Sequence, residues 1–285
     1  MSEEKILTKE IAEQFLEDED IVDELPDFAA YEKIEEEALL AILDFEIPEE
    51  LHDANREGHY QLSLIDRWID SDPMGATLYL DGLVELSPSL AETLTRFGMN
   101  LSLNGLTEVS DDSLETLTKN EGSLFLNGLS EIGDRTAEIL RMVLGNSLEL
   151  NGITELSESL AENLSRFHGD LHLNGVKLLN ESASLFLSKH FGSRLDQSTE
   201  WEEHLGAEGY PIVTQSKLSV VGTLSLNGVT SISDEAAGNL SNYTGNLSLE
   251  GISELSEVSA RSLAKIDQDN LRASQNIQKQ IAAYR

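Results

Sequence analysis

The chain has 285 residues, of which 53 are acidic and 19 basic, and its formal net charge is −34. Such a charge repels the phosphates of nucleic acids and anionic membrane surfaces, and it favours a basic partner. The hydrophobic fraction of 40% is enough for a core, which excludes an acidic disordered polymer, and the lack of cysteine excludes disulfides, thiolate metal sites and cysteine nucleophiles.

The beginning of the sequence carries no targeting signal that we can identify. Residues 1–8 are polar and charged, so we expect no signal peptide, and no run approaches the roughly 18 apolar residues of a membrane span. These features predict a cytoplasmic protein. The high negative charge is also what simple solubility or adaptation to a salty cytoplasm would produce.

Residues 1–76 form an acidic region with 24 acidic and 5 basic side chains. Apolar residues at helical spacing predict two helices in it, one that contains Ile11 and a second near residues 27–44. Residues 61–69, which include Trp68, are expected to add a strand or a helix. We interpret the region as a mostly helical cap over the first edge of the sheet predicted below, or as an acidic surface that docks onto a basic protein.

Residues 77–268 contain about seven units of 23 residues. Each unit opens on a Leu-x-Leu pair, whose first leucines are Leu78, Leu101, Leu124, Leu148, Leu171, Leu224 and Leu247. The second unit, for example, reads LSLNGLTEVSDDSLETLTKNEGS. Self-similarity at a fixed period predicts stacked copies of one supersecondary unit, because a single unit cannot bury its apolar face alone.

Within a unit, the alternating leucines predict a short strand, and a serine followed by proline or an acidic residue predicts the start of a helix. Such serines are Ser87, Ser110, Ser157 and Ser233. A later glycine, as at Gly122, Gly169 and Gly245, is typical of a helix C-cap.

A second glycine follows each predicted strand and indicates either a turn with positive φ or a close approach of two backbones. The glycines at this position are Gly82, Gly105, Gly128, Gly152, Gly175, Gly228 and Gly251. We assign them a structural role in the repeat.

Together these patterns predict an α/β solenoid with parallel strands on a concave face and short helices outside. The pattern LxLNGLxxLSxxxAxxL resembles the leucine-rich-repeat family, especially its short bacterial versions, from Leu78 to about Gln268. This resemblance implies protein or ligand binding on the concave strand face, and it does not imply catalysis.

The outward-facing strand positions form two rows. The first is the candidate partner-binding row, because it varies while its frame is constant, and consists of Tyr79, Ser102, Phe125, Glu149, His172, Ser225 and Ser248. Exposed Tyr79 and Phe125 would supply large contact areas, or would be incidental aromatic residues. The second row contains Asn104, Asn127, Asn151, Asn174 and Asn227. We interpret these amides as structural hydrogen-bonding groups, with a recognition stripe as the alternative.

Residues 194–223 interrupt the repeat between its fifth and sixth units. Trp201 and Tyr210 in this segment are further candidates for partner binding, because inserts in repeat proteins often carry function. Alternatively, the segment hides a degenerate unit, since residues 218–220 read as a strand. After the last unit, residues 269–285 are amphipathic and predict a C-terminal capping helix.

The sequence contains no motif that carries chemistry. Dinucleotide-binding, P-loop and nucleophile-elbow motifs do not occur, so we expect no enzyme, no catalytic residue and no cofactor. His168 and His172 lie four residues apart, with His190 in the next unit. Because the first two span a predicted helix-to-strand loop, we expect no metal site.

Two functions fit these observations. The first is a non-catalytic interaction module that binds a protein partner through the concave strand face, the insert at 194–223, or both. The alternative is an acidic inhibitor or immunity-type protein whose N-terminal region binds a basic partner. Neither function involves nucleic acid or a membrane, and both leave the oligomeric state open.

Overall fold

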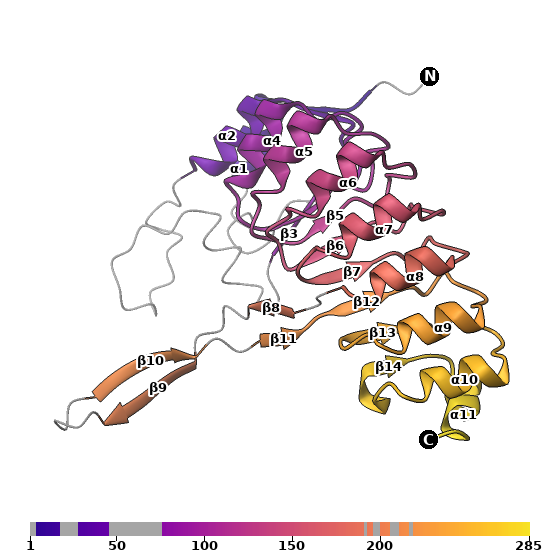
Figure 1. The fold of residues 1–285 in the computed structure, drawn as a ribbon. Helices are drawn as coiled ribbons and strands as arrows, with labels where there is room; N and C mark the ends of the chain where they lie inside the picture. Colours follow the sequence, from indigo (N-terminus) through magenta and orange to yellow (C-terminus); the bar gives the residue numbers. More distant parts are fainter. Residues whose placement is uncertain are drawn as a thin grey trace.

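The computed structural model describes residues 4–17, 28–45, 76–190 and 222–285 in full, and between 191 and 221 it describes the backbone of four short strands. The repeated units form a stack with strands on one side and helices on the other (Figure 1).

Eight strands form one parallel sheet in the order β14-β13-β12-β7-β6-β5-β4-β3. They are β3 (Thr77–Tyr79), β4 (Asn100–Ser102), β5 (Leu124–Phe125), β6 (Ser147–Glu149), β7 (Asp170–His172), β12 (Thr223–Ser225), β13 (Asn246–Ser248) and β14 (Leu271–Arg272). The opening leucines of neighbouring units are register partners, as Leu78 is of Leu101. The predicted alternation of parallel strands with helices is confirmed.

A short helix follows each strand. The helices are α4 (Pro88–Thr95), α5 (Asp111–Leu117), α6 (Asp134–Leu140), α7 (Glu158–Leu164), α8 (Glu181–Leu187), α9 (Asp234–Leu240), α10 (Glu257–Leu263) and α11 (Gln275–Ala282). The predicted serine caps are confirmed at Ser87, Ser110, Ser157 and Ser233. Each hydroxyl oxygen accepts a hydrogen bond from the backbone N–H three residues later, which satisfies a donor that the helix itself leaves free.

The core lies between the sheet and the helices. In the second unit, Leu101, Leu103 and Leu106 are fully buried, as are Leu114 and Leu117 of its helix. Burial of one leucine side chain stabilises the folded state by roughly 1.5–3 kcal/mol. The stability gained from these five leucines explains why the same apolar spacing recurs from unit to unit.

The glycines after the strands allow neighbouring units to approach closely. None of them has a positive φ, so the turn itself does not require glycine. A Cβ atom on Gly128 would lie 2.3 Å from the carbonyl oxygen of Asn104 and 2.4 Å from that of Leu106, both in the preceding unit. The prediction that Gly122, Gly169 and Gly245 cap helices is wrong, because the C-cap residues are Thr118, Ser165 and Ser241. Gly122 and Gly169 face the backbone of the unit before them, whereas Gly245 lies against the side chain of Tyr243 and the carbonyl oxygen of Gly222.

The N-terminal residues pack against the first unit. They form the parallel strands β1 (Ile6–Leu7) and β2 (Lys33–Ile34) and the helices α1 (Lys9–Leu16) and α2 (Glu36–Leu43). The second helix starts later than the predicted residue 27, because residues 33–34 pair with β1. Glu36 of α2 accepts hydrogen bonds from the hydroxyls of Ser89, at 2.5 Å, and Thr93, at 3.1 Å, on α4. The element predicted at 61–69 lies outside the described residues.

The four strands that the structure describes in the interruption of the repeat lie outside the parallel sheet. They are β8 (Ser193–Leu195), which pairs antiparallel with β11 (Ser219–Val221), and β9 (Glu200–Leu205), which pairs antiparallel with β10 (Pro211–Ser216). In the sheet, β12 pairs directly with β7, so the fifth and sixth units are neighbours. The segment is therefore an excursion, and β9 and β10 stand away from the sheet (Figure 1).

The C-terminal tail differs from the predicted capping helix in its first residues. A 3-10 turn at Gln268–Asn270 leads into β14, which extends the parallel sheet, and only then does α11 begin. Ile277 and Ile281 of α11 are buried against the last unit. The tail thus supplies an eighth strand as well as a helix.

Candidate functional site

The candidate site is the face of the parallel sheet opposite the helices, which we call the strand face. Side chains alternate along each strand, so Leu101 and Leu103 point into the core while Ser102 and Asn104 lie on the other face. Both predicted rows of outward positions therefore run across this face.

The second row is a continuous hydrogen-bond ladder. From Asp81 to Asn227, the side-chain oxygen Oδ1 of each member accepts the backbone N–H of the equivalent residue in the next unit, at 2.8–3.0 Å. The order is Asp81, Asn104, Asn127, Asn151, Asn174, Asn227 and Glu250. Asp81 stands at the end that only accepts, where a carboxylate serves as well as an amide. Glu250 stands at the end that only donates, through its backbone. These contacts give the asparagines a structural role.

Three residues of the first row are buried under this ladder. Ser102, Ser225 and Ser248 are only 2–5% exposed. Their hydroxyls donate to the side-chain oxygens of the preceding unit, as Ser102 does to Asp81 at 2.6 Å. The expectation that these serines present their side chains to a partner is therefore wrong. The serine side chain is small enough for the neighbouring amides to cover it.

The other four members of the row protrude. Tyr79 is 50% exposed, and Phe125, Glu149 and His172 are half-buried. The last three are register neighbours on β5, β6 and β7, so their side chains lie side by side. Tyr79 is separated from them by the strand that carries buried Ser102.

The carboxylate of Glu149 is held at the centre of this trio. Its Oε2 accepts hydrogen bonds from the side-chain amides of Asn127, at 3.0 Å, and Asn151, at 3.2 Å. A phenyl ring, an oriented carboxylate and an imidazole thus form one contiguous patch, which we call the Phe125–His172 patch. It can offer a partner an apolar contact beside a carboxylate whose direction is fixed by two hydrogen bonds.

The remaining sequence candidates do not join this patch in the described structure. Trp201 lies on β9, whose side chains are outside the description, and Tyr210 lies outside the described residues. His190 is buried and stacked between the rings of Phe167 and Tyr243, with centroids 6.3 and 6.2 Å away. Its ring is thus held within the core, and the part of the chain that the structure describes has no group of three potential metal ligands.

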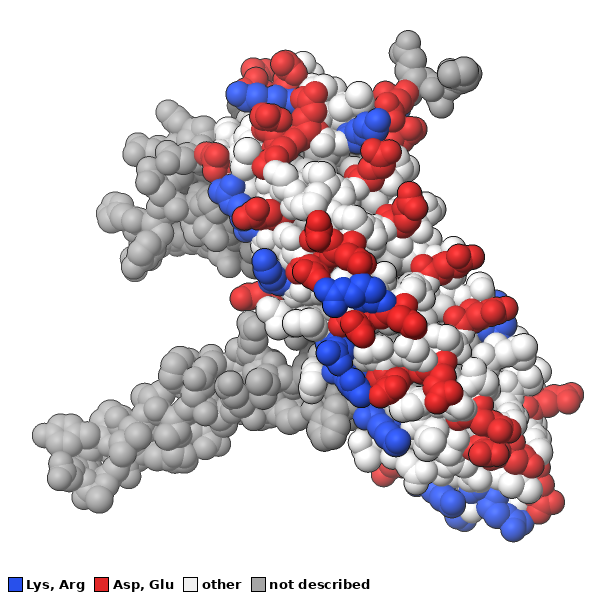
Figure 2. Space-filling view, turned by 45° about the horizontal axis from the view of Figure 1, so that its top comes forward, with Lys and Arg blue, Asp and Glu red and all other residues white. Residues whose placement is uncertain are grey.

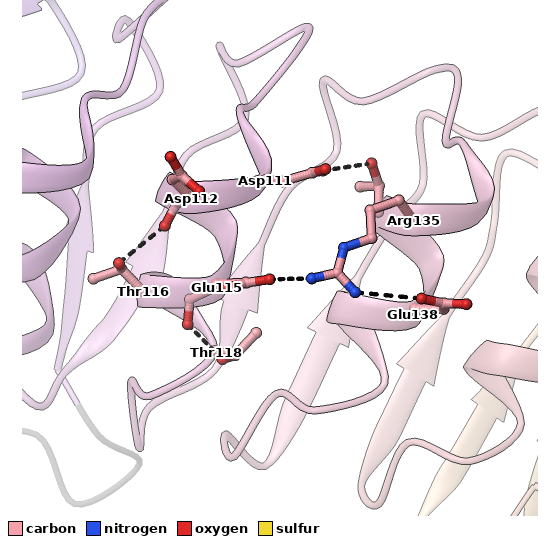
Figure 3. A network of polar contacts seen from close by, with 8 residues as sticks. Asp111, Asp112, Glu115, Thr116, Thr118, Arg135 and Glu138 are labelled. Atoms are coloured by element: carbon pink, nitrogen blue, oxygen red, sulfur yellow. Dashed lines mark hydrogen bonds and ion pairs between the residues drawn. The ribbon is translucent and has the colours of Figure 1, made fainter.

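A second polar network lies on the helical side. Arg135 of α6 contacts Glu115 of the neighbouring α5, and it also contacts Glu138 of its own helix at 3.4 Å (Figure 3). Thr136 bonds to Asp111 across the same pair of helices, at 3.5 Å. All these side chains are accessible to water, and we interpret the network as a surface link between two units rather than as a site.

The comparisons with known proteins add no family. Models of known protein families do not match the chain, and a search of curated proteins finds no significant match. Among the residues that the structure describes, every helix is too short or too polar to traverse a lipid bilayer.

Proposed function

We propose that this protein is a non-catalytic interaction module of the leucine-rich-repeat type, which binds a protein partner through the Phe125–His172 patch. The observation that carries the proposal is a comparison of equivalent positions within the chain. Three units have serine at this position, and each serine is buried and hydrogen-bonded into the ladder. Serine at this position therefore meets the packing and hydrogen-bonding requirements of the repeat.

Three successive strands carry Phe125, Glu149 and His172 at this position instead. Their side chains are half-exposed, although Glu149 still accepts hydrogen bonds from the ladder amides. A half-exposed phenyl ring gains less from burial than a core residue does, so fold stability alone does not favour it over serine. Residues that break a local rule without a structural gain are expected at functional sites. Partner binding is the gain that we assign to them, and the insert at 194–223 is a second contact that we propose for the same partner.

The N-terminal residues are proposed to cap the first unit. Phe28, Leu39 and Ile42 belong to the same buried cluster as Leu78 and Leu80 of that unit. The backbone carbonyl of Glu32 also accepts the N–H of Val84 at 3.2 Å. These contacts support a cap over the end of the stack, which a repeat protein needs because its terminal units have no further neighbour.

The test replaces all three patch residues with the residue that other units use. The triple variant Phe125→Ser, Glu149→Ser, His172→Ser and wild type are used to capture partners from lysate of the cells that make the protein, with washes at low and high salt. We expect one partner that wild type holds at high salt and that the triple variant loses. The unfolding temperature should stay equal or rise, because each new hydroxyl can join the ladder.

Tyr79→Ser is the matched control, since it makes the same kind of change two strands away and should leave capture intact. Loss of the partner in this control, with retention by the triple variant, would move the site to the end of the sheet. Loss of the partner from wild type at high salt would instead favour binding by charge, as in an acidic inhibitor.

A further inference from the structure

A groove lies on the edge of the stack where the strands lead into the helices, on a different surface from the Phe125–His172 patch. It has a volume of about 800 Å³ and crosses three successive loops, at residues 130–132, 154–157 and 177–180. Leu156 and Leu160 are buried at its floor, Ile132 is half-buried, and Leu178 is 71% exposed. We call it the rim groove.

The edge that contains the rim groove is acidic. The eighth residue of the unit is glutamate in five of the seven units, namely Glu85, Glu108, Glu131, Glu155 and Glu254, and all five are exposed. Figure 2 shows acidic side chains spread over most of the visible surface, with fewer basic ones among them. Part of the acidity of the rim-groove edge is structural, because helices begin on this edge and acidic residues stabilise helix N-termini.

The two other units have Leu178 and Ser231, which form a parallel β-bridge with each other, and Leu178 is the only apolar residue at this position. It stands where five other units have glutamate, and it is the most exposed large apolar side chain in the described structure. Neither the helix dipole nor core packing accounts for it, because the side chain is in contact with water and carries no charge. Leucine here costs solubility, which glutamate at the same position avoids.

We propose that the rim groove is a docking site for a basic segment of a partner protein. An apolar side chain of that segment packs against Leu178 and Ile132, and its cationic groups lie beside Glu131 and Glu155. Charge complementarity selects the occupant, because Lys177 is the one cation among the groove residues and the first turns of α7 and α8 add Glu158 and Glu181 nearby. The apolar floor of the groove adds a contact for the apolar side chain, so binding is expected to depend on this contact as well as on charge.

The decisive variant is Leu178→Glu. It removes the apolar anchor and at the same time makes the edge more acidic, so the two possible sources of affinity predict opposite signs. If the anchor is needed, binding weakens by about tenfold, the value expected for losing one well-buried leucine contact. If charge alone is responsible, binding becomes tighter. The variant should unfold at the wild-type temperature, because five other units carry glutamate at this position.

The probes are three labelled synthetic peptides, one of lysine, leucine and glycine, one with serine in place of leucine, and one with glutamate in place of lysine. Fluorescence anisotropy with wild type should rank the lysine–leucine peptide first, with the serine peptide about tenfold weaker and the glutamate peptide unbound. The double variant Glu131→Gln, Glu155→Gln should weaken the first peptide several-fold and reduce the dependence of its affinity on salt.

Phe125→Ser is the control for binding on the strand face and should leave these affinities unchanged. Three results would overturn the rim groove as the site. They are equal binding of the leucine and serine peptides, binding by Leu178→Glu that is as tight as wild type or tighter, and a loss in Phe125→Ser as large as that in Leu178→Glu. The first two results concern the rim groove alone, and the third would move the probe to the strand face, so failure of the rim groove does not remove the strand-face proposal.

Discussion

On the strand face, side-chain oxygens accept backbone hydrogens from unit to unit at 2.8–3.0 Å, whereas on the helical side charged groups such as Arg135 and Glu115 meet while exposed to water. Water cannot replace the hydrogen bonds of the ladder unless the backbones of neighbouring units move apart. The charged groups can exchange their partners for water at little cost. A polar side chain on the strand face is therefore part of the fold unless it departs from the ladder.

The largest expected effect comes from closing the space through which two units touch. Gly128→Ala would place a Cβ atom against two backbone oxygens of the preceding unit, which cannot rotate away. We expect the free energy of unfolding, measured by urea denaturation, to fall by about 3 kcal/mol, at the upper end for overpacked sites.

Gly238→Ala is the matched control. Gly238 lies within α9, and a Cβ atom there meets no other atom within 4 Å. Alanine should raise the free energy of unfolding by roughly 0.5–1 kcal/mol, because it favours helix and restricts the unfolded chain. Equal losses in the two variants would show that close contact between units is not what the repeated glycine provides.

The next effect comes from breaking the ladder at its centre. Asn127→Ala removes the acceptor of the Asn151 N–H and one donor to Glu149. We expect a loss of about 1–2 kcal/mol in the free energy of unfolding, since a partly buried N–H is left without its partner.

Asn242→Ala makes the same chemical change at an exposed position. The Asn242 amide donates to the carbonyl oxygens of Gly238 and Asn239, both at 3.2 Å. Water can replace these bonds, so the expected change is within about 0.5 kcal/mol. A loss as large as that of Asn127→Ala would contradict the distinction between the two sides of the molecule.

Much of this arrangement could be predicted from the sequence, and the parts that could not have physical reasons. Alternating leucines and serine caps predict strands and helix starts because they act within a few residues of each other. Burial of Ser102 depends on the amide of Asn104 and the carboxylate of Asp81, which folding brings together across units. Alternation predicts the face of a side chain and not what covers it.

The eighth strand and the exposed Leu178 differ in whether the sequence contains a pattern that predicts them. The eighth strand, Leu271–Arg272, is only two residues long and lacks the glycine of the repeat, so no pattern marks it. Leu178 was detectable, because it replaces a glutamate that five other units share.

A smaller effect on the free energy of unfolding is expected from pH, through His190, which is buried between Phe167 and Tyr243. Burial lowers the pKa of the His190 imidazole below its ordinary value of 6.5, while the Gly169 carbonyl, bonded to Nε2 at 3.0 Å, acts in the opposite sense. Above pH 6.5 both the folded and unfolded states are neutral at this residue. As the pH falls below 6.5, the unfolded chain binds the proton first, so the free energy of unfolding decreases.

His190→Phe is expected to flatten this slope. Phenylalanine occupies the equivalent position at Phe97 and Phe167, so it should fit between the neighbouring units. Nearby His168 and Asp170 affect the imidazole in opposite directions and remain in the variant. Urea titrations at several values between pH 7 and pH 5 compare the two proteins. An unchanged slope in His190→Phe would assign the pH dependence to other groups.

The smallest effect is expected on the helical side, where the network is extensive to the eye. Arg135→Ala removes the contacts with Glu115 and Glu138, yet all three side chains are more than half exposed. Exposed ion pairs contribute little because water and salt screen them, so we expect a loss of at most about 0.5 kcal/mol that disappears in high salt. Arg135 also offsets some of the repulsion between its acidic neighbours, and salt screens this effect too. A larger loss that persists in salt would therefore mean that the helical side, like the strand face, holds its units together through fixed polar contacts.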